Sequence, residues 1–89
     1  MRRGSLRQTQ NFKIRILPNK IGWARLGLVV GKRVGNACVR NSVKRRLREF
    51  FRLNRHFFPP GSDVVIIAKA GAGAKESEEM NQELGSVFS

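Results

Sequence analysis

The sequence has few of the residues that build disulfide-bonded, zinc-binding or membrane-spanning proteins. It contains one cysteine, three prolines and no tyrosine in 89 residues. A single cysteine can form neither an internal disulfide nor a cysteine-rich zinc site. No apolar run follows the basic amino end, as a secretory signal would require. The longest unbroken apolar run, Val64–Ala68, is far shorter than the roughly 20 residues that span a bilayer. These features predict a soluble cytosolic protein.

Acidic residues are also scarce, above all in the first two-thirds of the chain. Eighteen Lys and Arg residues stand against six Asp and Glu residues, for a formal net charge of +12. Residues 1–55 contain sixteen of the basic residues and one acid, Glu49, whereas residues 56–89 carry a net charge of −3. A surplus of this size indicates polyanionic partners, with nucleic acid first among them. We therefore expect residues 1–55 to supply the binding surface.

The length and the apolar periodicity predict one α+β domain over residues 1–89, because domains usually contain about 100–150 residues. Residues 12–16 alternate apolar and basic, which is typical of a half-buried strand. Residues 25–30 form a second strand, expected to pair with the first as a hairpin because sequential strands usually pair. Residues 63–68 are apolar and β-branched, like a central strand covered on both faces.

Two helices complete the predicted fold. From Val39 the apolar residues recur at three- and four-residue steps, which predicts an amphipathic helix that ends before Pro59-Pro60. Residues 76–88 form a final helix with Met80 and Leu84 toward the core. The expected architecture is a two-layer sandwich, in which strands are followed by a basic helix, a central strand and a C-terminal helix.

The basic helix carries Arg40, Lys44, Arg48 and Arg52 at steps of four residues. Like charges at this spacing destabilise a helix by about 0.2–0.5 kcal/mol per pair, and a helix selected only for solubility would mix signs. Each step rises about 6 Å, close to the spacing of successive phosphates on a nucleic-acid strand, and arginine can bind phosphate oxygens in pairs. The stripe therefore favours a phosphate-binding surface over a merely solvated face.

Residues outside the stripe extend or test this interpretation. Asn41 either caps the helix or hydrogen-bonds a base or ribose. Phe12 and Trp23 either pack inside the domain or stack on bases, and packing is favoured for both. One continuous basic tract would join helix to sheet through five further cations: Lys13, Arg15, Arg25, Lys32 and Arg33.

We expect no catalytic and no metal-binding residues in this chain. His56 stands alone and is expected at the surface. Cys38 has no base partner and is expected to be a small core residue. Asp63 has no second acid placed to share a metal with it.

The most specific pattern is Lys32-x-x-Gly35-x-Ala37-x-x-Arg40-Asn41-x-x-Lys44-Arg45-x-x-Arg48-Glu49. This stretch resembles the signature of the bacterial ribonuclease P protein subunit, and the Pro60-Gly61-x-Asp63 turn with the strand after it is similar to that family too. The resemblance covers roughly Phe12 to the end of the chain. Only eleven residues precede Phe12, and they do not show the pattern of the family's amino-terminal helix, so a chain without that helix is expected.

The resemblance implies a function. In this family the RNA subunit removes the 5′ leader of precursor tRNA by Mg²⁺-dependent hydrolysis, and the protein binds that RNA and the single-stranded leader. It also implies a left-handed β-α-β crossover at the basic helix. The matching positions for RNA binding are Lys32, Arg33, Arg40, Asn41, Lys44, Arg45 and Arg48. The candidates for leader binding are Lys13, Arg15 and Phe12.

Two other functions fit parts of the sequence. A small ribosomal or other structural RNA-binding protein would share the charge and the two-layer fold, and only the motif separates the two. The segment Val39–Arg55 is cationic and amphipathic, as a membrane-surface helix would be. Its apolar face is needed for the core of the domain, which disfavours that role.

Overall fold

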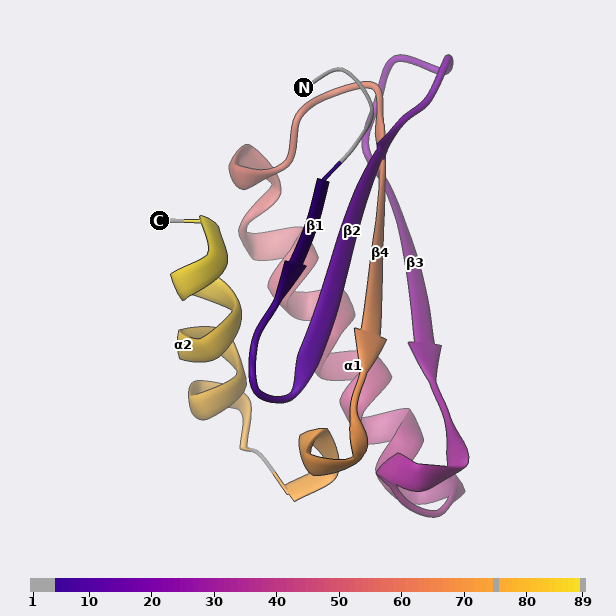
Figure 1. The fold of residues 1–89 in the computed structure, drawn as a ribbon, viewed down its shortest axis with the longest axis vertical. Helices are drawn as coiled ribbons and strands as arrows, with labels where there is room; N and C mark the ends of the chain where they lie inside the picture. The colour runs from indigo at the N-terminus through magenta and orange to yellow at the C-terminus, as the bar shows by residue number, and fades with distance from the viewer. Residues whose placement is uncertain (1–4, 75, 89) are drawn as a thin grey trace.

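The computed structural model describes residues 5–74 and 76–88, which form the expected two-layer α+β fold (Figure 1). The strands are β1 (Ser5–Gln8), β2 (Phe12–Pro18), β3 (Arg25–Val30) and β4 (Ser62–Ala68). The helices are α1 (Ala37–Leu53) and α2 (Ser77–Phe88), and the short 3-10 helices are η1 (Lys32–Val34), η2 (Arg55–Phe57) and η3 (Ala70–Ala74).

The strands form one sheet in the order β1-β2-β4-β3. β2 is antiparallel to both β1 and β4, whereas β3 runs parallel to β4. The predicted hairpin between residues 12–16 and 25–30 is therefore wrong, because β4 lies between these two strands. β4 is the most apolar and β-branched segment of the chain, and the inner position lets it pair along both of its edges.

The two helices cover one face of this sheet. Val64 and Ile66 of β4 are fully buried against them, whereas the alternate residues Asp63, Val65 and Ile67 are only partly buried. β4 is thus central, as expected, but the prediction that it is covered on both faces is wrong for the part of the chain that the structure describes. Its second face is left open beside the basic residues of β2.

The connection from β3 through α1 to β4 is left-handed. Both strands run in the same direction, and α1 lies behind the sheet in the view of Figure 1. Such crossovers are right-handed in about 98% of cases, so this feature is uncommon, and it is the one that the resemblance implied. The crossover places α1 along the covered face, with its outer side toward solvent.

Asn36 begins α1 by accepting a hydrogen bond from the Val39 N–H on its side-chain oxygen, at 3.0 Å. An asparagine at this position satisfies one of the backbone donors that a helix start leaves unpaired. The alternative that Asn41 caps the helix is wrong, because Asn41 lies inside α1 and is exposed. Its side chain is therefore available for contacts outside the domain.

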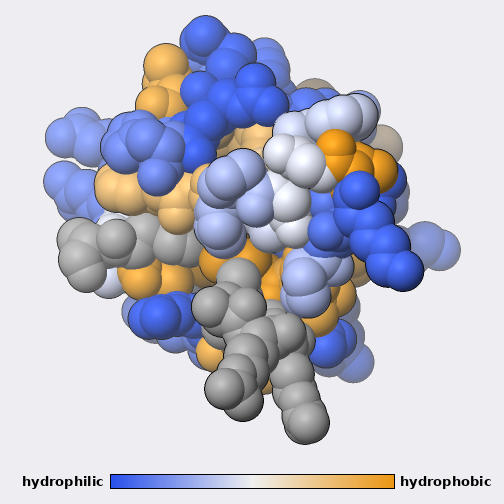
Figure 2. Space-filling model, turned by 90° about the horizontal axis from the view of Figure 1, so that it is seen from above, coloured by the Kyte–Doolittle hydropathy of each residue, from blue (hydrophilic) through white to orange (hydrophobic). Residues whose placement is uncertain are grey.

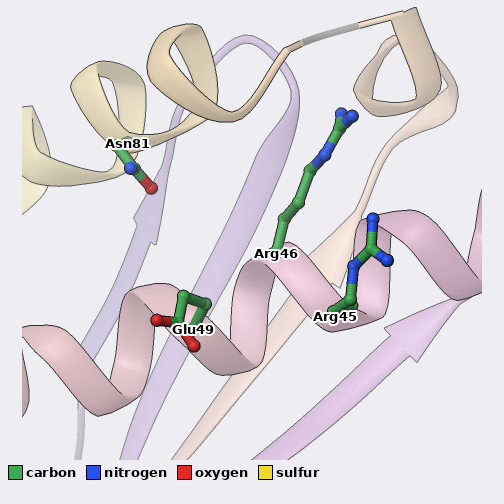
Figure 3. Close-up of a pocket in the computed structure, with 4 residues that line it drawn as sticks. All are labelled: Arg45, Arg46, Glu49 and Asn81. Atoms are coloured by element: carbon green, nitrogen blue, oxygen red, sulfur yellow. The ribbon is translucent and has the colours of Figure 1, made fainter.

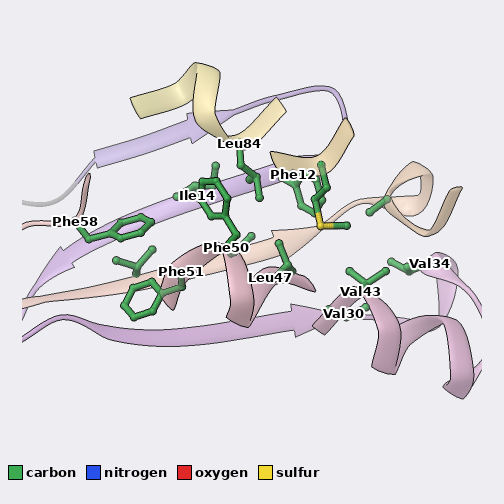
Figure 4. Packing of buried hydrophobic residues seen from close by; sticks show 14 of the residues in the cluster. Phe12, Ile14, Val30, Val34, Val43, Leu47, Phe50, Phe51, Phe58 and Leu84 are labelled. Carbon is green, nitrogen blue, oxygen red and sulfur yellow. The ribbon is translucent and has the colours of Figure 1, made fainter. Parts of the chain in front are cut away.

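The core lies between the sheet and the two helices (Figure 4). Leu47 of α1, Leu84 of α2 and Ile14 of β2 point into the same layer, and all three are fully buried. Met80 is fully buried too, so the expected orientation of α2 is confirmed. At the far end of α1, the rings of Phe51 and Phe58 stack with their centroids 4.9 Å apart.

Two glycines allow close packing at the start of α1: Gly35, just before that helix, and Gly73 in η3, which follows β4. A Cβ atom on Gly73 would lie 2.3 Å from the Val34 carbonyl oxygen, and one on Gly35 would lie 2.7 Å from Val39 Cγ1. Gly35 also has a φ of +155°, which side-chain-bearing residues rarely adopt. These contacts fix the position of η1 and α1 relative to the sheet, and so fix the basic residues that they carry.

Candidate nucleic-acid interface

The outer side of α1 forms a cationic surface along the helix. Its buried side chains are Val43, Leu47, Phe50 and Phe51, so the residues between them point away from the core. Arg48 is exposed, and Arg40 and Lys44 are partly buried at the border of the apolar side. Since they are spaced by four residues, these three cations lie one above another along the helix at steps of about 6 Å.

These three cations have no acidic partner in residues 5–74 and 76–88. The ion pair on α1 joins Glu49 to Arg52 one turn later. The hydrogen bond between them lowers the pKa of Glu49 and raises that of Arg52. Arg52 is thus neutralised locally, whereas Arg40, Lys44 and Arg48 present their charge to whatever lies outside the domain.

Arg40 also has an unsatisfied hydrogen-bond donor. Its Nε atom is buried and has no hydrogen-bond partner among the described residues. A buried donor left unpaired costs about 1–3 kcal/mol. Arg40 is therefore held at the border of the apolar side at a cost to the stability of the domain.

The positions predicted for RNA binding all lie on one segment of the chain. Lys32 and Arg33 belong to η1, immediately before α1, and both are exposed. Val34 is buried beneath them and anchors η1 to the core. The structure therefore brings seven side chains onto η1 and the outer side of α1: Lys32, Arg33, Arg40, Asn41, Lys44, Arg45 and Arg48.

A pocket of about 220 Å³ borders this surface where α1 faces α2. Arg45, Arg46 and Glu49 of α1 and Asn81 of α2 line it, and Figure 3 shows these side chains on facing stretches of the two helices. Its polar lining continues the basic surface of α1 as far as α2.

The sheet residues do not join this surface. Lys13 and Arg15 alternate along β2 with the buried residues Phe12, Ile14 and Ile16, so they point to the open face, away from α1. The prediction of one continuous basic tract is wrong, because the sheet lies between its two halves. Phe12 is fully buried, so packing is confirmed for it and leader binding by its ring is wrong.

Arg25 is engaged within the domain. Its Nε and Nη2 atoms donate to the two carboxylate oxygens of Asp63 at 2.8 and 2.9 Å, and Asn19 Nδ2 donates to Asp63 Oδ1 at 2.9 Å. These hydrogen bonds, that of Arg25 first, lower the pKa of Asp63 to about 2. Arg25 therefore ties the start of β3 to the start of β4 and adds little positive charge to the open face.

Two predictions of burial are wrong. Cys38 is exposed, because it lies one residue before Val39 and one residue rotates a helical side chain by about 100°. Trp23 is 60% exposed on the turn between β2 and β3. His56 is exposed as expected. In the described ranges, no three His, Cys, Asp or Glu side chains gather where they could hold a metal ion, and no helix of that part is long and apolar enough to cross a membrane.

A family model described as Ribonuclease P matches residues 1–89. The chain belongs to the ribonuclease P protein family. It is 45% identical over 80 residues to the ribonuclease P protein component of Citrifermentans bemidjiense, an alignment that covers 90% of this chain and 68% of the relative. It is 39% identical over 87 residues to that of Desulforapulum autotrophicum, with 98% and 74% covered.

Solved structures of ribonuclease P proteins share this fold. The protein from Thermotoga maritima superposes with a TM-score of 0.84 at 29% identity, covering 96% of this chain and 81% of that one. The Staphylococcus aureus protein gives a TM-score of 0.83 at 29% identity, covering 94% and 77%. The family assignment confirms the predicted ribonuclease P role and disfavours a ribosomal protein. Residues 5–8 form β1, and residues 9–11 are not helical.

Proposed function

We propose that this chain binds the catalytic RNA of a bacterial ribonuclease P and the 5′ leader of precursor tRNA, and so assists 5′ maturation in the cytoplasm. The observation that carries the proposal is the row of cations on α1, which have no acidic partner among the described residues. The chain spans 68% and 74% of the two relatives compared, and the proposal concerns the part that it shares with them.

The side chains of α1 suit the phosphates of an RNA. Arg40 and Arg48 can each hold two phosphate oxygens with a planar guanidinium, and Lys44 between them adds a compact charge. Asn41, exposed on the same helix, adds an amide that can hydrogen-bond a ribose or a base edge.

The leader is proposed to lie on the open face of the sheet. Lys13 and Arg15 of β2 point to this face, and Val65 and Ile67 of β4 are partly exposed beside them. Cations next to an apolar surface can bind single-stranded RNA, because the cations contact its phosphates and the apolar side chains contact its bases. Phe12 has no part in this site because it is buried.

The hydrolysis itself is assigned to the RNA subunit. Mg²⁺ bound by that RNA would supply the chemistry of phosphodiester hydrolysis. The part played by this chain is electrostatic, because its cations offset the repulsion between the phosphates of two RNAs held side by side. By this account the precursor tRNA and the catalytic RNA are its partners, and it needs neither a membrane nor another protein.

The salt dependence of binding to a bacterial ribonuclease P RNA tests this function. If Arg40, Lys44 and Arg48 each contact a phosphate, the affinity should fall with salt at a log–log slope of about −2 to −3. The single variant Arg48→Ala should make that slope shallower by about one contact. An unchanged slope would place Arg48 outside the interface, and equal affinity for an unrelated structured RNA would favour general RNA binding.

A further inference from the structure

Trp23 is an exposed aromatic side chain without an evident role in packing. It is the only tryptophan of the chain, and 60% of its surface is exposed on the turn between β2 and β3. Ring exposure on this scale forgoes most of the favourable burial that tryptophan offers. The two RNA-binding sites proposed above, the basic surface of α1 and the open face of the sheet, do not explain why Trp23 is exposed.

The backbone around Trp23 is held in place by Asn19. Asn19 Nδ2 donates to the Trp23 carbonyl oxygen at 3.0 Å, and Asn19 Oδ1 accepts from the Ile21 N–H at 3.0 Å. The Asn19 backbone N–H donates to the Gly61 carbonyl oxygen at 2.7 Å, which attaches the turn to the segment entering β4. The backbone that carries the ring is therefore held in place, which reduces the ordering that is needed when a ligand binds.

A pocket of about 440 Å³ lies beside this ring, where the turn meets the residues after α1. Besides Trp23 its lining includes Arg55, His56, Phe58 and Pro60, and no acidic residue among those that the structure describes. The Arg55 guanidinium lies 5.7 Å from the centroid of the Phe51 ring, which keeps the charge near the pocket. The pocket thus brings together the aromatic ring of Trp23, the cation of Arg55 and the apolar side chains of Phe58 and Pro60.

Figure 2 views the molecule from the end that carries this turn, the top of Figure 1. Hydrophilic residues surround pale and apolar patches on this surface. The same end receives the C-terminus of α1. The pocket beside Trp23 thus combines an exposed aromatic ring with the cation of Arg55, which complements a single-stranded nucleic acid better than a folded protein surface of mixed sign.

We infer that Trp23, together with Arg55 and His56, forms a stacking site for a base of single-stranded RNA. The base lies on the indole ring, and Arg55 contacts the adjoining phosphate. This site is separate from the phosphate contacts of α1 and from the proposed leader site on the open face, and it rests on the proposed RNA-binding function. A stacked base contributes roughly 5- to 150-fold to affinity when tested by alanine substitution.

Trp23 supplies the probe for the test. With one tryptophan and no tyrosine, the indole emission of the full chain comes from Trp23 alone. Titration with a short oligoadenylate should quench this emission in a saturable way, since a base stacked on the indole is in direct contact with its excited state and deactivates it. The Trp23→Ala variant should bind the same oligonucleotide roughly 5- to 150-fold more weakly, measured by anisotropy of a labelled strand, and Trp23→Phe should keep most of the affinity.

The controls separate stacking from charge and from the function itself. Leu53→Ala, which shortens another exposed apolar side chain at this end, should leave the affinity unchanged, whereas Arg55→Ala should weaken it. If quenching is absent while the catalytic RNA still binds and still responds to Arg48→Ala, the stacking site is wrong and the proposed function stands. Equal quenching by duplex RNA, or equal affinity of Trp23→Ala, would overturn the stacking site as well. If the wild-type chain does not bind the catalytic RNA at all, both the stacking site and the proposed function are wrong.

Discussion

Replacing Leu47 by alanine is expected to lower the free energy of unfolding by about 2–5 kcal/mol. Leu47 is fully buried on α1 and points into the layer shared by the sheet and α2 (Figure 4). The substitution removes apolar contacts on three sides and leaves a cavity in a small core. Since small domains are stable by about 5–15 kcal/mol, a large share of the total should be lost.

Urea unfolding followed by circular dichroism measures this loss. The matched control is Leu53→Ala, the same substitution six residues later on α1, where the side chain is 57% exposed. That control should change the stability by no more than about 0.5 kcal/mol. Equal losses for the two variants would contradict the packing of α1 against the sheet.

Replacing Lys44 and Arg48 together by alanine is expected to weaken binding to a ribonuclease P RNA by about 10²- to 10⁴-fold. Hydrogen bonds to charged groups contribute about 1.5–3 kcal/mol each, and each 1.4 kcal/mol is a factor of about ten in affinity. Neither side chain belongs to the core, so the fold should remain. Filter binding or anisotropy at fixed salt gives the affinity, and circular dichroism verifies the fold.

The control for this double variant is the combined substitution of Arg7 and Lys20 by alanine. Both side chains are exposed, and both lie outside α1. The control removes the same formal charge, so it corrects for the general attraction between a basic protein and RNA. A similar loss of affinity in both double variants would mean that net charge, and not the row on α1, determines binding.

The local elements of this fold could be predicted from the sequence, whereas their pairing could not. Residues 25–30 form β3 as expected, and the apolar period from Val39 marks α1, because both patterns depend only on near neighbours in the chain. The position of β4 between β2 and β3 depends on contacts across more than thirty residues. The spacing of apolar residues within a segment does not show which distant segment it pairs with. The usual preference for pairing of sequential strands predicts that β2 pairs with β3, which is wrong.

The burial of single residues could likewise be predicted only where the local sequence pattern is regular. The alternation around Phe12 identified it as a core residue, because its strand is regular. Trp23 lies on a turn whose direction is set by the hydrogen bonds of Asn19, so its exposure could not be read from its type. The cap Asn36 precedes Val39, where the apolar period begins, by three positions, so the sequence does contain a cap signal, at Asn36 and not at Asn41.

The resemblance supplied what residue patterns could not. The motif from Lys32 to Glu49 identified the family, and with it the left-handed crossover that Figure 1 shows. The charge pattern alone predicts nucleic-acid binding but does not identify a family. The roles of the individual cations on η1 and α1 stay predictions, and the variants described above test them.

Cleavage of a precursor tRNA by a bacterial ribonuclease P RNA at low Mg²⁺, with and without this chain, tests the central claim most directly. The account predicts that the chain raises cleavage at the mature 5′ end and that the Lys44 and Arg48 double variant, still folded, does so far less. Wild-type chain that is folded and yet neither binds the RNA nor stimulates cleavage at any Mg²⁺ concentration would contradict it.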